Sequence, residues 1–146
     1  MNSFSLWNLF TSDVVTAIAS ILLIVFSVLS WTVIVEKIRL FGAAHRKRPT
    51  GNPEIAIKPF DKNLWFLAMV AYVSPFIGLF GTVWGVMDSF ASIGANQSVS
   101  IGVIAPGLAI ALGTTALGLI VAIPAAIAHQ VFTKKADDLY DAMGGK

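Results

Sequence analysis

Three long stretches of the chain contain no charged residue. They cover residues 14–35, 63–87 and 89–133. A helix needs about 20 consecutive apolar residues to cross the hydrocarbon core of a bilayer, so the third stretch must hold a span and a connection. The pattern predicts an all-α integral membrane protein, a single membrane domain over 1–146 with three transmembrane helices. Their approximate limits are residues 12–36, 63–92 and 102–132.

The overall composition also indicates a bilayer environment. Hydrophobic residues make up 56% of the 146 residues and charged residues only 12%, whereas soluble domains carry about 25% charged residues. There is no cysteine, which excludes a disulfide framework and a thiolate metal site. The net charge of +2 gives no indication of a nucleic-acid partner. No metal-ligand, cofactor or catalytic motif is present, so we expect a protein that is not an enzyme and binds neither metal nor cofactor.

The basic residues predict the orientation in the membrane. Seven of the ten Lys and Arg residues lie between the first two spans, and the other three follow the third span. By the positive-inside rule, the N-terminus is outside, while the short 37–62 connector and the 133–146 tail are cytoplasmic. The tail is expected to extend the third helix until Gly144 and Gly145 end it. A signal peptide is the alternative for the first span, but it requires basic residues before the apolar stretch rather than after it. The basic cluster 45–48 is explained by topology, with binding of anionic lipid as the second explanation.

Small residues recur at helical spacing in the second and third spans. The residues expected to lie along the packing faces are Gly78, Gly81, Gly85, Gly107, Ala111 and Gly118. Membrane helices associate where small residues let two backbones approach closely. The two stripes therefore predict a tightly packed antiparallel pair of helices, although a small-residue face also suits the wall of a narrow path.

Few polar side chains are expected deep in the membrane. The main candidates are the hydroxyls of Thr82, Thr114 and Thr115. A hydroxyl in a membrane helix usually bonds a carbonyl of its own helix, which is the simpler interpretation of each threonine. Thr82 and Thr115 both lie on small-residue faces, however, and together they predict a common polar path. Asp88 and His129 are expected near the outer and inner interfaces, because a buried charge in the membrane is costly.

Four motifs carry a resemblance to a known family. They are SPFIGLFGTVWGVM at 74–87, APGLA at 105–109, TALGL at 115–119 and AIPA at 122–125. As a set they closely resemble the TolQ/ExbB proton-channel family. The first span, in which Ser30 and Trp31 are followed by basic residues, is more similar to the TolQ branch than to the ExbB branch.

The resemblance implies a subunit of a machine in the bacterial inner membrane that is driven by the proton motive force. In this family five copies form a ring around the helices of a single-span partner, TolR or ExbD, and a third protein, TolA or TonB, carries work to the outer membrane. The partner supplies a membrane aspartate. Thr82 and Thr115 match the two family threonines that face the central path, where their hydroxyls surround the partner's carboxyl group. Thr114 is a further candidate for the lining of this path.

One residue and one segment depart from the family pattern. Ile110 stands where the family usually has a glutamate, five residues before the third-span threonine, and an aliphatic side chain cannot bind a proton. The 37–62 connector replaces the large cytoplasmic helical region that the family has between its first two spans. The alternative function is therefore a structural membrane oligomer of the same fold that has lost proton coupling. A solute transporter is a third possibility, which the lack of an inverted repeat disfavours.

Overall fold

The computed structural model describes residues 14–46, 52–96 and 101–144. These residues form helices and turns only. The helices are α2 (Val14–Arg46), α3 (Pro53–Asp61), α4 (Leu64–Asn96) and α5 (Ile101–Ala142). Three candidate membrane spans, over Val14–Ala44, Pro53–Ala91 and Ile104–Ala142, are long and apolar enough to cross a bilayer. The prediction of an all-α membrane protein with three spans is confirmed.

The helices extend beyond the spans that were expected from the charge pattern. The segment expected as a connector, 37–62, holds the end of α2 and all of α3. The segment 133–146 continues α5 as far as Ala142, in agreement with the expected extension of the third helix. Charged residues end an apolar stretch without ending a helix, because Lys, Arg and Glu are good helix formers. The hydropathy pattern therefore located the spans better than the ends of the helices.

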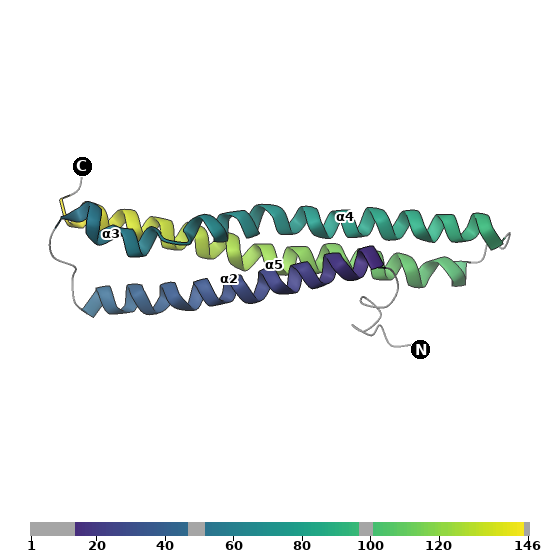
Figure 1. Ribbon diagram of the computed structural model, residues 1–146, viewed down its shortest axis with the longest axis horizontal. Coiled ribbons are helices and arrows are strands. Elements are labelled where there is room, and N and C mark those ends of the chain that lie inside the picture. Colours follow the sequence, from purple (N-terminus) through teal and green to yellow (C-terminus); the bar gives the residue numbers. More distant parts are fainter. Residues whose placement is uncertain (1–13, 47–51, 97–100, 145–146) are drawn as a thin grey trace.

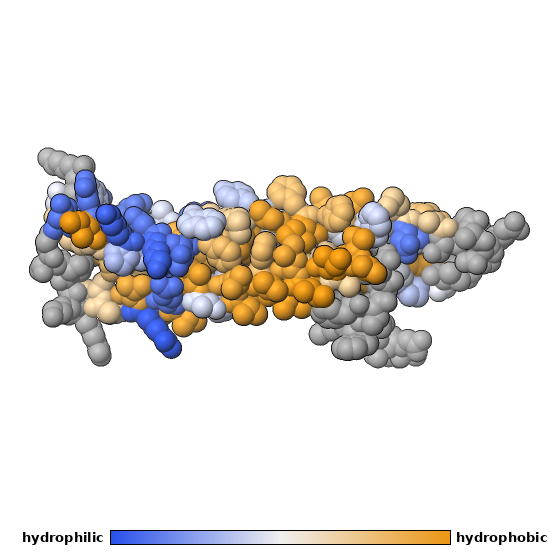
Figure 2. Space-filling model, viewed as in Figure 1, coloured by the Kyte–Doolittle hydropathy of each residue, from blue (hydrophilic) through white to orange (hydrophobic). Residues whose placement is uncertain are grey.

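The molecule is an elongated bundle (Figure 1). α4 and α5 run antiparallel and lie side by side over most of their length, and α2 packs against both of them. α3 lies at the end of the bundle where α5 ends, and the beginning of α2 lies toward the other end (Figure 1). Figure 2 shows a broad apolar band around the middle of the bundle and hydrophilic residues gathered at the end that holds α3.

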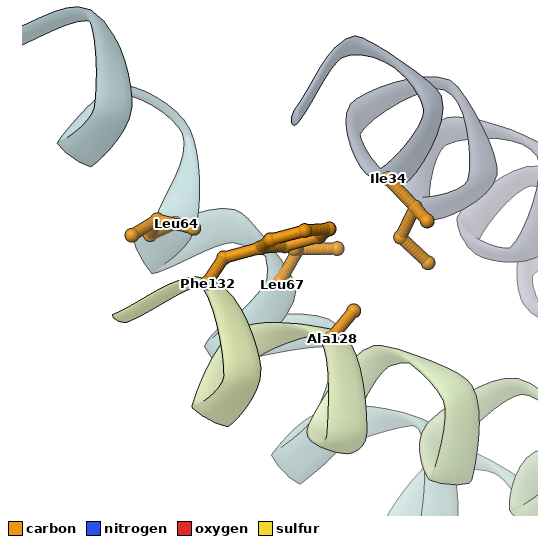
Figure 3. Close-up of a cluster of buried hydrophobic side chains, with 5 residues drawn as sticks. All are labelled: Ile34, Leu64, Leu67, Ala128 and Phe132. Atoms are coloured by element: carbon orange, nitrogen blue, oxygen red, sulfur yellow. The ribbon is translucent and has the colours of Figure 1, made fainter. Parts of the chain in front are cut away.

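The three long helices meet in two buried clusters. One cluster comprises Ile34, Leu64, Leu67, Ala128 and Phe132, and Figure 3 shows these side chains converging from α2, α4 and α5. The other cluster comprises Leu23, Val70, Val121 and Ala125. Both clusters combine large residues with alanines of α5, so that α5 approaches its neighbours closely. They fix α2 against the α4/α5 pair.

Capping residues explain the short helix α3. Asn52 is its N-cap and accepts a hydrogen bond from the backbone N–H of Glu54 at 3.0 Å, while Pro53 occupies the first helical position. Both residues are favoured there, since the cap pairs an exposed N–H and proline has no N–H to leave unpaired. Asn63, between α3 and α4, has a φ of 65°, a left-handed conformation that asparagine tolerates better than most residues. The chain therefore turns at Asn63 before α4 begins.

A buried lysine holds α3 in place. Lys37 of α2 is 0% exposed, and its Nζ donates hydrogen bonds of 2.8 Å to both Pro59 O and Phe60 O. These carbonyls belong to the last turn of α3, where helical carbonyls lack N–H partners and a positive charge is favourable. Phe41 packs against Phe60, with ring centroids 4.9 Å apart, and stacks on Phe132 of α5 at 5.7 Å. Lys37 and these rings join α2, α3 and α5.

Candidate functional site

The site is built on a stretch where the backbones of α4 and α5 almost touch. A Cβ atom added to Gly78 would lie 2.7 Å from the carbonyl oxygen of Thr114, and one added to Gly118 would lie 2.7 Å from the carbonyl oxygen of Ser74. Real Cβ atoms essentially never come within 3.0 Å of such atoms. Only glycine at both positions permits this distance between the two helices.

The other small residues of the two predicted faces lie along the same interface. A Cβ atom on Gly85 would meet the Cβ of Ala111 at 2.8 Å, and one on Gly107 would meet the Oγ of Ser89 at 2.5 Å. A Cβ atom on Gly81 would lie 2.8 Å from the Thr114 hydroxyl. The six residues expected to pack helices thus all lie between α4 and α5, and the close approach brings hydroxyls of one helix to the carbonyls of the other.

Thr82 of α4 and Thr115 of α5 lie together in this interface. Their hydroxyl groups are hydrogen-bonded to each other. Each hydroxyl also has a carbonyl acceptor across the interface: Ala111 O lies 2.7 Å from the Thr82 hydroxyl, and Gly78 O lies 3.2 Å from the Thr115 hydroxyl. The bond from Thr82 to its own helix, at Gly78 O, is longer, 3.3 Å. The strongest contacts of Thr82 therefore join the two helices, whereas the simpler interpretation had each threonine bonded within its own helix.

Thr114 belongs to the same cluster but lies deeper. Its hydroxyl has two carbonyl acceptors within reach, Ala111 O at 2.7 Å and Gly78 O at 3.2 Å, and lies 3.4 Å from the hydroxyl of Thr82. Thr114 is 0% exposed, whereas Thr82 and Thr115 are partly exposed. Thr114 was expected to line a path, yet in a single chain it offers no surface to one. In this arrangement its hydroxyl joins α4 to α5.

The cluster has more acceptor positions than protons. Thr82, Thr114 and Thr115 together have three hydroxyl protons, one each, for the carbonyls of Gly78 and Ala111 and for one another. If Thr82 donates to Ala111, Thr115 is free to donate to Thr82; if Thr82 donates to Thr115, Thr115 donates to Gly78. The two arrangements differ only in rotation of hydroxyl hydrogens. In both arrangements every hydroxyl proton is donated within the cluster, so a polar group that approaches its exposed side meets acceptor lone pairs. A hydroxyl becomes a donor to that group only when it rotates away from its partner in the cluster.

The remaining candidate residues lie outside this cluster. Ile110 is partly exposed on α5, beside Ala111 in sequence, and supplies no polar atom. Asp88 is exposed on α4. The Nδ1 atom of His129 is buried and has no hydrogen-bond partner among the described residues. The structure therefore brings the three threonines and the small residues together at one interface. Ile110, Asp88 and His129 are not part of that cluster.

Comparison with known proteins identifies the family to which the chain belongs. Residues 54–144 match the family model described as the MotA/TolQ/ExbB proton channel family. This range holds all of α3 except Pro53, together with α4, α5 and the three threonines. The chain belongs to this family. The match covers more than half of the chain, and it includes the whole α4/α5 interface.

Individual relatives share about half of their aligned residues with the chain. The biopolymer transport protein ExbB of Salmonella typhimurium is 49% identical over 70 residues, which are 48% of this chain and 29% of that protein. The ExbB protein of Pseudomonas putida is 52% identical over 68 residues, 47% of this chain and 21% of the relative. The Tol-Pal system protein TolQ of Pseudomonas aeruginosa is 47% identical over 79 residues, 54% of this chain and 34% of the relative.

These relatives define the class of this protein and its location. Each aligned segment covers about a third or less of the relative's own length. The family membership and the three membrane-spanning helices identify a multi-pass protein of the bacterial inner membrane, a member of a proton-channel family. Similar identity to ExbB and TolQ proteins leaves the resemblance to the TolQ branch a prediction.

Proposed function

We propose that the chain is a subunit of a proton-conducting complex that couples the proton motive force to work at the cell envelope or to outer-membrane transport. The observation that carries this proposal is the hydroxyl pair of Thr82 and Thr115, which is joined across the α4/α5 interface and partly exposed. The printed names of its relatives, a biopolymer transport protein and a Tol-Pal system protein, are consistent with this role.

In this proposal the proton carrier is a carboxyl group of another protein. A carboxylate within a membrane is costly unless polar groups surround it, and hydrogen bonds to its charged form favour that form. Several copies of the chain, five by analogy with the family, would enclose the helices of a TolR- or ExbD-type single-span partner. Thr82 and Thr115 of each copy would then accept from the carboxylic acid through their lone pairs, and would donate to the carboxylate by rotating a hydroxyl away from its carbonyl partner in the cluster. A TolA- or TonB-type protein would transmit the work.

The role of the hydroxyls is tested by Thr82→Val and Thr115→Val, each co-expressed with the partner and reconstituted into vesicles. Valine keeps the branched shape and removes the hydroxyl, so we expect proton flux to fall at least tenfold while membrane insertion and the mass of the complex are unchanged. Thr32→Val is the matched control, because the Thr32 hydroxyl is exposed and donates to Val28 of its own helix. Wild-type flux in both test variants would reject the proposed role.

One observation favours a second candidate, a structural oligomer that has lost proton coupling. Ile110 lies one turn before Thr114 on α5 and provides no group that binds a proton. Ile110→Glu distinguishes the two functions, with Ile110→Gln as a control for size and polarity. Proton flux that rises only in the glutamate variant indicates a channel that lost proton coupling when this glutamate was replaced. Full flux in the original chain indicates that the threonines suffice, and loss of assembly in both variants indicates that Ile110 packs between copies.

A further inference from the structure

The outer face of α2 contains an open groove that the proposed channel function does not use. The groove is shallow and wide open, because every residue that lines it belongs to α2. The lining includes Ser27, Val28, Trp31, Val35, Glu36 and Arg39. The residues of α2 that contact α4 and α5, such as Leu23 and Ile34, are buried on another face of the helix. The groove therefore faces away from the bundle.

The groove changes character along its length. Toward the middle of α2 its lining is mainly apolar, with Val28 and Trp31 61% and 55% exposed, and also includes Ser27 and Thr32. Toward the α3 end of the bundle it is bordered by Glu36 and Arg39, which are both exposed and lie three residues apart on the same face. From Trp31 to Arg39 the helix rises about 12 Å. A mainly apolar groove that ends in one negative and one positive charge has the polarity of a phospholipid.

We propose that this groove binds one phospholipid with a zwitterionic headgroup that carries a primary ammonium, as in phosphatidylethanolamine. Arg39 binds the phosphate through its guanidinium group, which favours phosphate oxygens, and Glu36 accepts hydrogen bonds from the ammonium. An acyl chain lies along Val28, Trp31 and Val35. The headgroup lies at the α3 end of the bundle, which the distribution of basic residues assigns to the cytoplasmic leaflet.

Charge complementarity selects this headgroup over the other common ones. A phosphatidylglycerol headgroup brings a negative charge alone, so Glu36 would repel it as Arg39 attracts it. A phosphatidylcholine headgroup carries a positive charge that has no N–H to donate to Glu36. Only a headgroup with both a phosphate and a primary ammonium pairs with both side chains, because ammonium is a donor of three hydrogen bonds.

The proposal is tested by the lipids that remain bound to the full chain. The purified protein is stripped of lipid, reconstituted into vesicles with equal amounts of phosphatidylethanolamine, phosphatidylglycerol and phosphatidylcholine of identical acyl chains, then extracted and analysed by native mass spectrometry. We expect phosphatidylethanolamine to be retained at least threefold over each of the others. Glu36→Gln should abolish the preference over phosphatidylcholine, and Arg39→Gln should lower the retention of all three lipids.

Matched controls separate the groove from general charge effects. Glu54→Gln and Lys58→Gln alter exposed charges of α3 outside the groove and should leave the lipid profile unchanged. Trp31→Ala should reduce retention regardless of headgroup. An unchanged lipid profile in Glu36→Gln and Arg39→Gln, with helix content preserved by circular dichroism, would overturn the proposal, as would enrichment of phosphatidylglycerol in the original chain. A photo-crosslinker at Val35 should label lipid, and labelling of a second copy instead would show that a neighbouring chain fills the groove.

Discussion

Gly118 of α5 lies against Gly78 of α4 with no side chain between them. A Cβ atom on Gly118 would come to 3.1 Å from the Gly78 Cα and 2.7 Å from the Ser74 carbonyl oxygen. Both of these atoms belong to the backbone, so neither can turn aside as a side chain would. The hydroxyl cluster lies next to this contact, and its hydrogen bonds across the interface depend on the close approach of the helices.

Gly118→Ala should separate α4 from α5. A methyl group forced into a packed interface typically costs about 1–3 kcal/mol, and we expect a loss of this size in the free energy of unfolding measured by titration with sodium dodecyl sulfate in mixed micelles. Proton flux should fall as well, because Thr82 and Thr115 would be drawn apart. Gly42→Ala is the control, since nothing lies within 4 Å of a Cβ atom at that position. Equal stability of the original chain and Gly118→Ala would contradict the close contact.

The hydroxyls of Thr82 and Thr115 should be energetically coupled. In a double-mutant cycle of Thr82→Val and Thr115→Val, we expect a coupling energy of about 0.5–1 kcal/mol, the size found for hydrogen bonds between membrane helices. The measurement is again unfolding in mixed micelles. A parallel cycle of Thr32→Val with Thr115→Val should give no coupling, because Thr32 bonds within α2. Additive effects in the first cycle would show that the two hydroxyls do not share a bond.

Lys37→Met should release α3 from the bundle. Methionine keeps much of the apolar stem but leaves the carbonyls of Pro59 and Phe60 without their 2.8 Å donors. Hydrogen bonds to charged groups contribute about 1.5–3 kcal/mol, and we expect a loss of stability in that range together with faster hydrogen exchange of the amides of α3. Lys62→Met, which alters an exposed lysine near the same corner, should leave both quantities close to those of the original chain. Unchanged exchange in Lys37→Met would show that α3 does not depend on this lysine.

Ser74→Ala should leave the stability unchanged or raise it by up to about 1 kcal/mol. Ser74 is 0% exposed, and its hydroxyl has no hydrogen-bond partner among the described residues. A buried polar group without a partner costs free energy, so its removal relieves a penalty. Thr114→Val provides the contrast, because that hydroxyl is bonded and its loss should destabilise the chain. If Ser74→Ala were the more destabilising of the two, the Ser74 hydroxyl would have to be bonded within the bundle.

Much of the central helix pair could be predicted from the sequence. The uncharged stretches located the three spans, and the spacing of Gly78, Gly81 and Gly85 predicted the face on which α4 meets its partner. The structure places Thr82 and Thr115 next to each other, because two small-residue stripes in antiparallel helices fix which positions lie opposite each other. That they line a polar path stays a prediction. Their exposure to a path between copies depends on neighbouring chains, which one sequence does not specify.

Two features at the α3 end of the bundle could not be predicted from hydropathy. In the sequence, Lys37 is one of the basic residues that predict the orientation in the membrane. Its burial could not be predicted, because it depends on where α3 folds back against α2. The segment around Pro53 was interpreted as a connector rich in turn residues, although Asn52, Pro53 and Glu54 form a cap, a first-position proline and an acidic first turn, a pattern typical of a helix start. That local signal was available, whereas the contact between Lys37 and α3 is set by tertiary packing.

The length of α5 gives it a mechanical property. Its 42 residues extend about 63 Å, roughly twice the hydrocarbon thickness of about 30 Å, and its final ten residues carry exposed charges suited to water. A tilt of α5 about its glycine contact with α4 is therefore amplified along the helix. A pivot of about 10° near that contact displaces a point 30 Å along the axis by about 5 Å, so an angular change beside the threonines becomes a measurable translation at the membrane surface.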